Sequence, residues 1–228
     1  MKSLRYTTLR NGVLVLLRHG ESTFNADGRF SGWADCPLTQ KGVLQAHEAG
    51  RILRDAGVAF DACFTSVLSR TKNTATIVLG EMGQLGIPVT NAWQLNERHY
   101  GILEGASRAD VVARYGVAQV EAWRNAPDAA PPPLAGDDAR HPRLQSFYQD
   151  VATELLPSSE SLREAFRRVI GYFDAAIRPV VESGGKVLVV SHGNPLRALI
   201  AHLQGLQDGD IPAIAVPNTE PLVCRPSK

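Results

Sequence analysis

Two runs of consecutive apolar residues stand out along the chain, and each leads directly into a histidine followed by a glycine. The first run covers residues 13–17 and leads into Arg18 and His19; the second, within residues 186–191, leads into His192. An unbroken apolar run of this length predicts a strand that is buried on both faces, as in a parallel sheet. Ligands of open α/β sheets bind at the carboxyl ends of such strands, so the two histidines are expected at one site if the strands are neighbours.

Helical spacing fills much of the rest of the chain. Apolar residues recur at i, i+3, i+4 and i+7 after Thr39, a predicted N-cap, and most clearly after Glu160. A further strand is predicted at residues 60–64, and Pro179 is expected to end or kink the long helix. The predicted helices cover residues 40–56, a segment ending near 79, 106–115, 117–124, 160–180 and a segment containing 197–203. This alternation predicts an α/β fold, a three-layer sandwich with a mainly parallel sheet and helices on both faces.

One long segment, residues 126–143, is rich in proline and lacks a periodic apolar pattern. A loop of this length is usually functional, and its other interpretation is a linker between domains. Because the residues after it complete the predicted sheet, we expect a single catalytic domain over residues 1–228. Within it, residues 106–152 are expected to form a cap or lid region over the site.

The charges of the chain are balanced and interspersed. Among 228 residues there are 24 Lys and Arg against 23 Asp and Glu, a formal net charge of +1. This balance argues against a nucleic acid or a membrane surface as the main partner, although it allows a local basic pocket. Three widely spaced cysteines, Cys36, Cys63 and Cys224, lack a metal-ligand pattern, so reduced thiols are expected. The start of the chain has too few consecutive apolar residues for a signal peptide or a membrane span, and we expect a cytoplasmic protein.

Arginine and histidine at a strand end suggest an anion site that contains a nucleophile. One isolated histidine after a strand is more often a hydrogen-bonded loop residue, but two such strand ends in one chain favour function. Neutral histidine can act as a covalent nucleophile, and its ordinary pKa of about 6.5 makes that form available at neutral pH. Arg18 and Arg70 can bind a phosphate through paired hydrogen bonds, as lysine cannot, and His192 can donate to a phosphoryl oxygen. No metal is required for this chemistry.

The motif Arg18-His19-Gly20 resembles the signature of the histidine phosphatase superfamily. Further segments resemble the phosphoglycerate mutase branch of that superfamily, and they extend the resemblance over nearly the whole chain. These segments are residues 29–33, 65–70, 95–101, 160–162 and 192–194. The sequence Asn-Glu-Arg-His-Tyr-Gly at residues 96–101 is similar to a motif of the mutases that depend on 2,3-bisphosphoglycerate.

This resemblance implies a role for each matching residue. His19 would carry the phosphoryl group as phosphohistidine, and Glu97 would be the general acid and base for the substrate hydroxyl. Arg18, Arg70 and His192 would hold the transferring group. The residues implied in binding the substrate or its second phosphate are Asn25, Ser31, Gly32, Arg98, Tyr100, Arg108, Arg124 and Asn194. The implied reaction interconverts 3-phosphoglycerate and 2-phosphoglycerate, with 2,3-bisphosphoglycerate as the primer and no metal.

The chain departs from the family pattern at three places, which keeps other functions open. Arg108 stands where the family usually has lysine, and Arg124 is followed by Asn125 where a second arginine is usual. Relatives also commonly continue after the position of Cys224 with a tail near the mouth of the site. Weaker retention of the substrate would favour a phosphatase that acts on small phosphate esters through phosphohistidine. A third interpretation is a non-catalytic protein that binds a phosphorylated metabolite. Relatives are often dimers or tetramers, so the resemblance also implies a homodimer or homotetramer.

Overall fold

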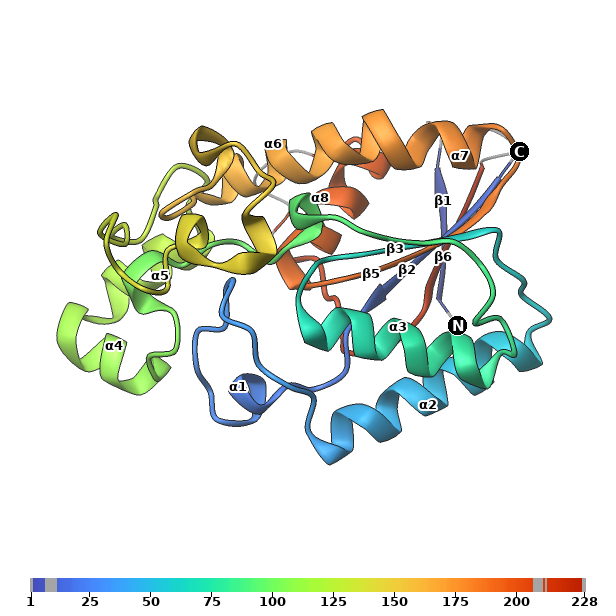
Figure 1. The fold of residues 1–228 in the computed structure, drawn as a ribbon, viewed down its shortest axis with the longest axis horizontal. Helices are drawn as coiled ribbons and strands as arrows, with labels where there is room; N and C mark the ends of the chain where they lie inside the picture. Colours follow the sequence, from blue (N-terminus) through green and yellow to red (C-terminus); the bar gives the residue numbers. More distant parts are fainter. Residues whose placement is uncertain (1, 7–11, 207–210, 212, 227–228) are drawn as a thin grey trace.

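A six-stranded sheet forms the centre of the molecule, in the order β1-β6-β2-β5-β3-β4 (Figure 1). This computed structural model describes residues 2–6, 12–206, 211 and 213–226. The strands are β1 (Lys2–Tyr6), β2 (Val13–Arg18), β3 (Ala62–Thr65), β4 (Val89–Asn91), β5 (Lys186–Ser191) and β6 (Leu222–Pro226). Strands β2, β5, β3 and β4 are parallel, whereas β6 runs antiparallel to β2. The sheet is therefore mainly parallel, as predicted, and β1, β4 and β6 are additions to the predicted strands.

Helices alternate with these strands along the chain. They are α1 (Thr23–Ala26), α2 (Gln40–Asp55), α3 (Ser69–Glu81), α4 (Arg108–Tyr115), α5 (Val117–Asn125), α6 (Leu162–Tyr172), α7 (Arg178–Glu182) and α8 (Gly193–Gln204). Short turns of tighter helix are η1 (Trp93–Leu95), η2 (Gly101–Leu103), η3 (Pro142–Leu144), η4 (Ser146–Tyr148) and η5 (Thr153–Leu155). Thr39 caps α2 as predicted, because its side chain accepts a hydrogen bond from the amide of Gly42.

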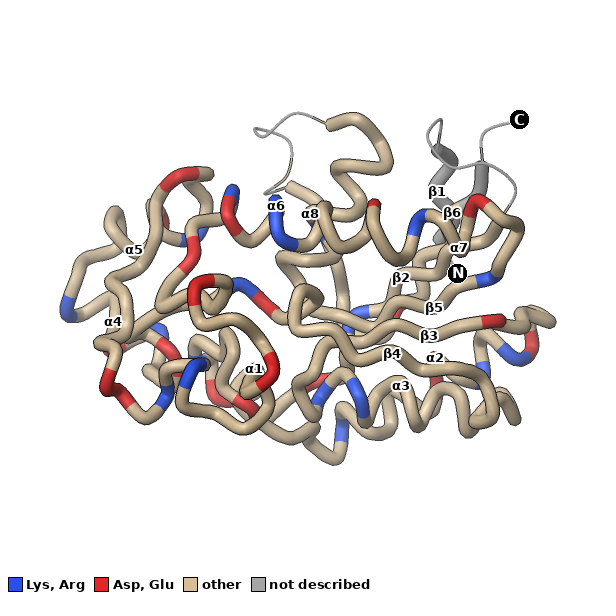
Figure 2. The backbone as a smooth tube through the Cα atoms, turned by 45° about the horizontal axis from the view of Figure 1, so that its top comes forward, with Lys and Arg blue, Asp and Glu red and all other residues tan. Residues whose placement is uncertain are grey.

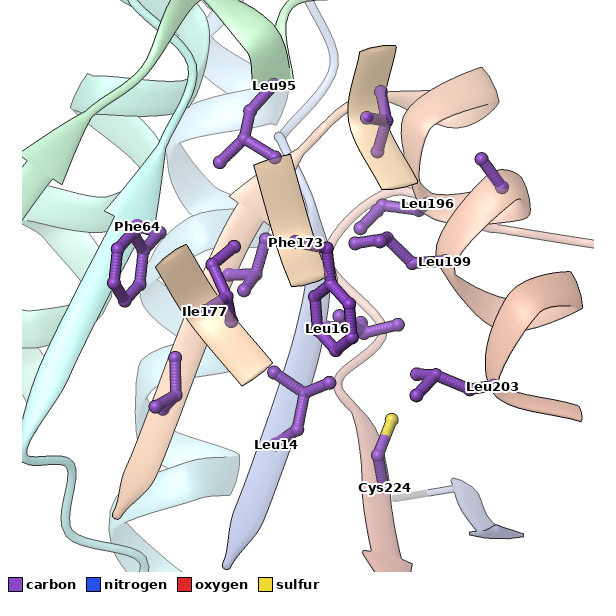
Figure 3. Packing of buried hydrophobic residues seen from close by; sticks show 14 of the residues in the cluster. Leu14, Leu16, Phe64, Leu95, Phe173, Ile177, Leu196, Leu199, Leu203 and Cys224 are labelled. Carbon is purple, nitrogen blue, oxygen red and sulfur yellow. The ribbon is translucent and has the colours of Figure 1, made fainter. Parts of the chain in front are cut away.

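Both faces of the sheet are covered, which explains the unbroken apolar strands. Leu14 and Leu16 of β2 face α6, α7 and α8, and they pack in a cluster with Phe173 and Leu199 (Figure 3). The intervening residues of β2 pack against α2 and α3 on the opposite face. Alternate side chains of a strand point to opposite faces, so a strand covered on both faces is apolar throughout. Burial of each large apolar side chain contributes roughly 1.5–3 kcal/mol to the stability of the fold.

The long helix predicted from residue 160 continues past Pro179 instead of ending there. Its first part, α6, starts with a capping box in which Ser161 and Glu164 bind each other's backbone amides. A π-helical segment, η6 (Phe173–Ile177), then leads into α7, which holds Pro179 within its first two positions. Proline lacks an amide hydrogen and its ring collides with the carbonyl four residues earlier in an α-helix. The wider turn just before Pro179 relieves that conflict and lets the helix run to Glu182.

Residues 106–152 lie beyond the carboxyl ends of the central strands, on the left in Figure 1. Helices α4 and α5 pack on Phe30 through Val111, Val120 and Trp123, so this region is joined to the segment that follows α1. The segment predicted as a long loop has no helix or strand between residues 126 and 141, and η3 begins at Pro142. No helix in the described part of the chain is long and apolar enough to cross a membrane.

Candidate active site

The carboxyl ends of β2 and β5 lie side by side and bring the two histidines together. The strands pair in parallel, with Arg18 opposite Ser191, and the amide of His19 donates to the Ser191 carbonyl at 3.0 Å. The rings of His19 and His192 are therefore 5.0 Å apart between centroids, at an interplanar angle of 65°. The two strands are thus neighbours, which is the condition under which the sequence placed both histidines at one site.

The ring of His19 is held in one orientation and one tautomer. Its Nδ1 atom lies 2.6 Å from the carbonyl oxygen of Gly20, and a carbonyl can only accept, so Nδ1 carries the proton. The lone pair is therefore on Nε2. Burial, followed by the charges of Arg70 and Arg18, holds the pKa of His19 well below its usual 6.5. The imidazole is consequently neutral and nucleophilic at physiological pH.

His192 is bound on both of its ring nitrogens. Arg70 donates from Nε to Nδ1 at 3.3 Å, so Nε2 carries the proton and donates to the Ser66 hydroxyl at 2.9 Å. We expected His192 to donate to a phosphoryl oxygen, but the structure uses its N–H within the protein. In this arrangement His192 orients the Arg70 guanidinium. Burial, with Arg70 second, holds the pKa of His192 well below 6.5, so the ring is also neutral.

Arg70 is completely buried, yet in the part of the chain that the structure describes no carboxylate forms an ion pair with it. Besides His192, its donors bind the carbonyls of Gly32 at 2.8 Å and Ala34 at 2.9 Å, and the sulfur of Cys36 at 3.7 Å. A guanidinium has five N–H groups, so these contacts leave one N–H to donate elsewhere. A buried cation that is held only by neutral groups is suited to an anionic ligand.

Three charged side chains converge on Gly193, at the start of α8. A Cβ atom built on this glycine would lie 3.7 Å from Glu97 Oε2, 3.8 Å from Arg197 Nη1 and 3.9 Å from Arg18 Cζ. Arg18 also donates from Nη1 to the carbonyl of Val216 at 2.9 Å, while its Nε is buried and has no partner among the described residues. An unpartnered buried donor beside two other polar groups marks the position of a polar ligand.

Glu97 is fixed by its backbone and by one of its two carboxyl oxygens. Its carbonyl accepts from the indole of Trp33 at 2.6 Å and from Arg168 at 3.2 Å. Its Oε1 accepts from the amides of Arg98 at 2.8 Å and Asn194 at 3.3 Å. The second oxygen, Oε2, is the one that faces Gly193 and the arginines, so it is the oxygen placed to exchange a proton with a ligand.

A cavity of about 650 Å³ opens over these residues. Arg18, Glu97 and Gly193 line it, whereas His19, Arg70 and His192 are buried directly behind it. Most of the residues predicted to bind the substrate line the same cavity, namely Asn25, Ser31, Gly32, Tyr100, Arg108, Arg124 and Asn194. These residues are widely separated in the sequence, and it is the fold that brings them to one cavity.

Arg98 is the predicted substrate-binding residue that does not line the cavity. It is completely buried, and its guanidinium donates to the carbonyls of Glu160, Trp123 and Ala129. Burial of a cation requires this degree of hydrogen bonding. The structure therefore gives Arg98 the role of joining the end of α5 to the start of α6, in place of the predicted contact with the substrate.

Sequence reasoning missed several residues that hold the site together. Asn218 donates from its side chain to the His19 carbonyl at 2.6 Å, and the amide of Thr219 donates to the Arg18 carbonyl at 3.0 Å. Thr219 has a φ of 55°, a left-handed conformation that costs energy in a residue other than glycine. Ser66 had a signal, because it lies in a segment that resembles a family motif, but Asn218 had none. Unpredicted cations that also line the cavity are Arg29, Arg163, Arg167 and Arg197.

Within the described part of the chain, no group of three or more His, Cys, Asp or Glu side chains is arranged to hold a metal ion. All three cysteines are buried and free.

Comparisons with known proteins agree on the family that this chain resembles. Residues 14–227 match the model of the histidine phosphatase superfamily, branch 1. The chain is 47% identical over 211 residues to a 2,3-bisphosphoglycerate-dependent phosphoglycerate mutase of Nitratidesulfovibrio vulgaris strain Miyazaki F, covering 92% of this chain and 85% of the relative. It is 45% identical over 214 residues to the protein of the same name from Treponema pallidum strain Nichols, with the same two coverages.

Solved structures with a similar fold include both mutases and phosphatases. The alpha-ribazole phosphatase of Shigella flexneri superposes with a TM-score of 0.69 and 28% identity, over 92% of this chain and 89% of that one. A phosphoglycerate mutase of Bacillus anthracis superposes with a TM-score of 0.62 and 26% identity, over 86% of this chain and 82% of that one. The fold alone thus does not separate transfer to a second substrate hydroxyl from transfer to water.

Proposed function

The chain belongs to branch 1 of the histidine phosphatase superfamily, and from this membership we propose that it interconverts 3-phosphoglycerate and 2-phosphoglycerate through a phosphohistidine at His19. The observation that carries the proposal is the neutral His19 ring, whose Nε2 lone pair has no hydrogen-bond partner among the described residues while two arginines lie close by. The sequence identity of 45–47% to curated mutases supports the choice of substrate.

The transfer itself needs a nucleophile and a proton carrier. As the His19 Nε2–P bond forms, the P–O bond of the ester breaks, and the leaving oxygen takes a proton from Glu97 Oε2. In the return step Glu97 accepts the proton of the attacking hydroxyl and the N–P bond breaks. Arg18 and Arg70 offset the negative charge of the phosphoryl group throughout.

The cavity also fits a ligand with two phosphates. Arg18 offers a buried Nε without a partner among the described residues, at the inner end. Arg108 and Arg124 line the outer part and would hold the second phosphate or the carboxylate of the ligand. We propose that 2,3-bisphosphoglycerate, when bound here, supplies the phosphoryl group that primes His19.

The proposal is tested by paired assays of isomerisation, with and without 2,3-bisphosphoglycerate. The purified chain should convert 3-phosphoglycerate to 2-phosphoglycerate, and 2,3-bisphosphoglycerate should stimulate the reaction. Labelled bisphosphoglycerate should also leave an acid-labile phosphoryl adduct on the protein. Hydrolysis without any isomerisation would reject the mutase, and the absence of both activities and of the adduct would favour a non-catalytic binding protein.

A matched pair of variants locates the adduct. His19→Ala should abolish it, whereas His47→Ala should retain it, because His47 is bound to Glu81 on α3, on the outside of the helical layer. Retention of the adduct in His19→Ala would mean that another residue is the nucleophile.

A second candidate function is hydrolysis of a phosphate ester by the same phosphohistidine. Beyond the arginines the cavity continues along α6 and α8, past Phe166, Ile170 and Ala201, and its volume of about 650 Å³ is large for a three-carbon acid. Asn125 also supplies no charge where the family usually has an arginine. The assays above distinguish this function, because a phosphatase would release inorganic phosphate and leave isomerisation unstimulated.

A further inference from the structure

A carboxyl group that takes no part in the proposed transfer is buried beneath the loop of residues 31–34. Glu104, at the end of η2, has 5% of its surface exposed. Its Oε1 atom accepts from the backbone amides of Trp33 at 2.8 Å and Tyr100 at 3.1 Å. The loop that lines the cavity and the segment that carries Glu97 thus meet at a single oxygen atom.

The contact between this carboxyl and the loop is too close for any other residue at position 32. A Cβ atom added to Gly32 would lie 2.0 Å from Glu104 Oε1, and Gly32 has a φ of 51°. Only glycine combines this conformation with such a close approach. The loop backbone therefore rests directly on the carboxyl group.

The same loop positions two residues of the proposed mechanism. The carbonyls of Gly32 and Ala34, on either side of Trp33, accept from the Arg70 guanidinium at 2.8 and 2.9 Å. The indole of Trp33 donates to the Glu97 carbonyl at 2.6 Å. A displacement of the Trp33 backbone would consequently move both the cation and the proton carrier.

We propose that Glu104 is a positioning residue: its carboxyl holds the loop of residues 31–34 and thereby sets the places of Arg70 and Glu97. The inference rests on the proposed function for its link to catalysis. Glu104 does not line the cavity in which the phosphoryl group would be transferred. It acts through backbone hydrogen bonds that keep the Arg70 guanidinium and the Glu97 carboxylate in position. A misplacement of about 1 Å can lower the rate of catalysis roughly a hundredfold.

Because this carboxyl can ionise, the positioning role of Glu104 can be followed in the dependence of activity on pH. Burial raises the pKa of Glu104 to about 8, against the opposing effects of the two amide hydrogen bonds and of the nearby arginines. The folded protein thus keeps a proton that the unfolded chain releases near pH 4.5. Stability accordingly falls as pH rises from about 4.5 to 8, and above 8 the carboxyl becomes charged in place. A buried charge draws in water and loosens the loop.

The groups that face this carboxyl come from several segments of the chain, and only the carboxyl itself titrates near neutral pH. His99, whose Nδ1 lies 3.4 Å from Glu104 Oε1, has its pKa lowered to about 3 by burial and stays neutral. Burial raises the pKa of the Tyr148 and Tyr100 hydroxyls above the usual 10, so both stay neutral. Arg70 and Arg140 remain cationic, and Arg140 donates to the Glu104 carbonyl at 3.1 Å. Among these groups only Glu104 changes charge between pH 6 and 9.

The test compares Glu104→Gln with Glu104→Ala across pH 6 to 9. Glutamine keeps an oxygen for the two amides and cannot ionise, so kcat at pH 7 should stay within about threefold of the parent. Alanine leaves two buried amides unpaired and should lower kcat about ten- to a hundredfold. The parent should lose activity above pH 8, and Glu104→Gln should not show that decline.

A structural control and a second measurement separate positioning from general destabilisation. Val169→Ala, on the face of α6 that packs into the core, should lower the melting temperature by a similar amount as Glu104→Ala but leave kcat unchanged. Hydrogen–deuterium exchange of peptides that cover residues 31–36 should be faster only in Glu104→Ala. A Glu104→Ala protein with parental kcat and parental exchange would overturn the proposal, as would a high-pH decline that Glu104→Gln shares with the parent.

Failure of this inference can be told apart from failure of the proposed function. If the parent hydrolyses the ester and does not isomerise it, the same variants are compared by the rate of phosphohistidine formation. If the parent forms no adduct, the function is rejected, and the exchange measurement alone still reports whether Glu104 holds the loop.

Discussion

The phosphate-binding region has two parts that differ in how their residues are held. The inner part consists of His19, Arg70 and His192, which are 3%, 0% and 0% exposed. The outer part is exposed and consists of Arg108, at the start of α4, and of Arg124 and Asn125, at the end of α5. The side chains of Arg124 and Asn125 bind Glu121 at 3.1 and 2.7 Å. Charged residues of either sign are spread over the rest of the fold (Figure 2).

This difference indicates which part determines the reaction and which part adjusts affinity. Each inner side chain is buried and held by hydrogen bonds within the protein, so its position is set before any ligand arrives. The outer side chains are exposed to solvent, which screens their charge and lets them move. Substitutions in the inner part should therefore change kcat strongly, and substitutions in the outer part should change mainly KM.

The largest effect is expected for His19→Ala, which removes the proposed nucleophile. Catalysis should fall at least about a thousandfold, because no other group can take over the covalent step. The variant should still bind phosphoglycerate, since the cavity and its arginines are unchanged. Isomerisation assays and equilibrium dialysis measure the two properties, and a loss of less than tenfold in kcat would contradict the assigned role.

A large effect is also expected for Arg70→Lys, although the charge is retained. Lysine cannot reproduce the contacts with Gly32, Ala34 and His192, and a buried carbonyl left without a donor costs about 1–3 kcal/mol. We expect kcat to fall about a hundredfold and the melting temperature to fall as well.

The same substitution at an outer position is the matched control. Arg108→Lys exchanges the same side chains on an exposed residue that lines the cavity, so only KM should rise, by about two- to fivefold. Steady-state kinetics decide the comparison. Equal losses of kcat in the two variants would show that inner and outer arginines contribute to catalysis in the same way.

The inner part was also the more predictable part, and the reason is physical. β2 and β5 are covered on both faces, so each is continuously apolar, and the histidine after each strand is easy to recognise. β4 and β6 lack this signal, since all three residues of β4 are exposed and the apolar run of β6 is interrupted after three residues by Arg225 and Pro226. The end of such a strand can be predicted from the sequence of the strand itself, without knowledge of contacts to distant residues.

The partners of individual polar groups could not be predicted in the same way. Arg98 lies in a motif that resembles a substrate-binding segment, but its donors bind carbonyls 25 to 62 residues away. Asn218 reaches the His19 carbonyl across 199 residues of sequence. Such contacts depend on where loops cross in the folded chain, and neither periodicity nor composition records that.

A moderate effect is expected on changing the pH, because both inner histidines are buried and neutral. The pKa of His19 and of His192 is lowered well below 6.5, so the folded protein does not take up their protons when the unfolded chain does. Stability is therefore lost as pH falls below about 6.5. Urea unfolding is compared at pH 7.0 and 5.5 in the Glu104→Gln protein, because the titration of Glu104 changes stability in the opposite direction over this range. Its midpoint should be lower at pH 5.5, and the ring nitrogens of both histidines should not titrate over this range by NMR. Titration of either ring near pH 6.5 would contradict the neutral tautomers.

The smallest effect is expected for Asn125→Arg, which restores a second cation beside Arg124. The new guanidinium would be exposed at the outer part of the cavity and would also compete for Glu121, so its gain is limited to that of a surface charge, about 0.2–1 kcal/mol. We expect KM for 3-phosphoglycerate to fall about two- to fourfold at low salt, with kcat unchanged and the gain reduced at high salt. Steady-state kinetics at two ionic strengths measure this, with Asn125→Gln as the uncharged control. A change in the ratio of isomerisation to hydrolysis would contradict the separation of the two parts, because it would show that an outer charge determines where the phosphoryl group goes.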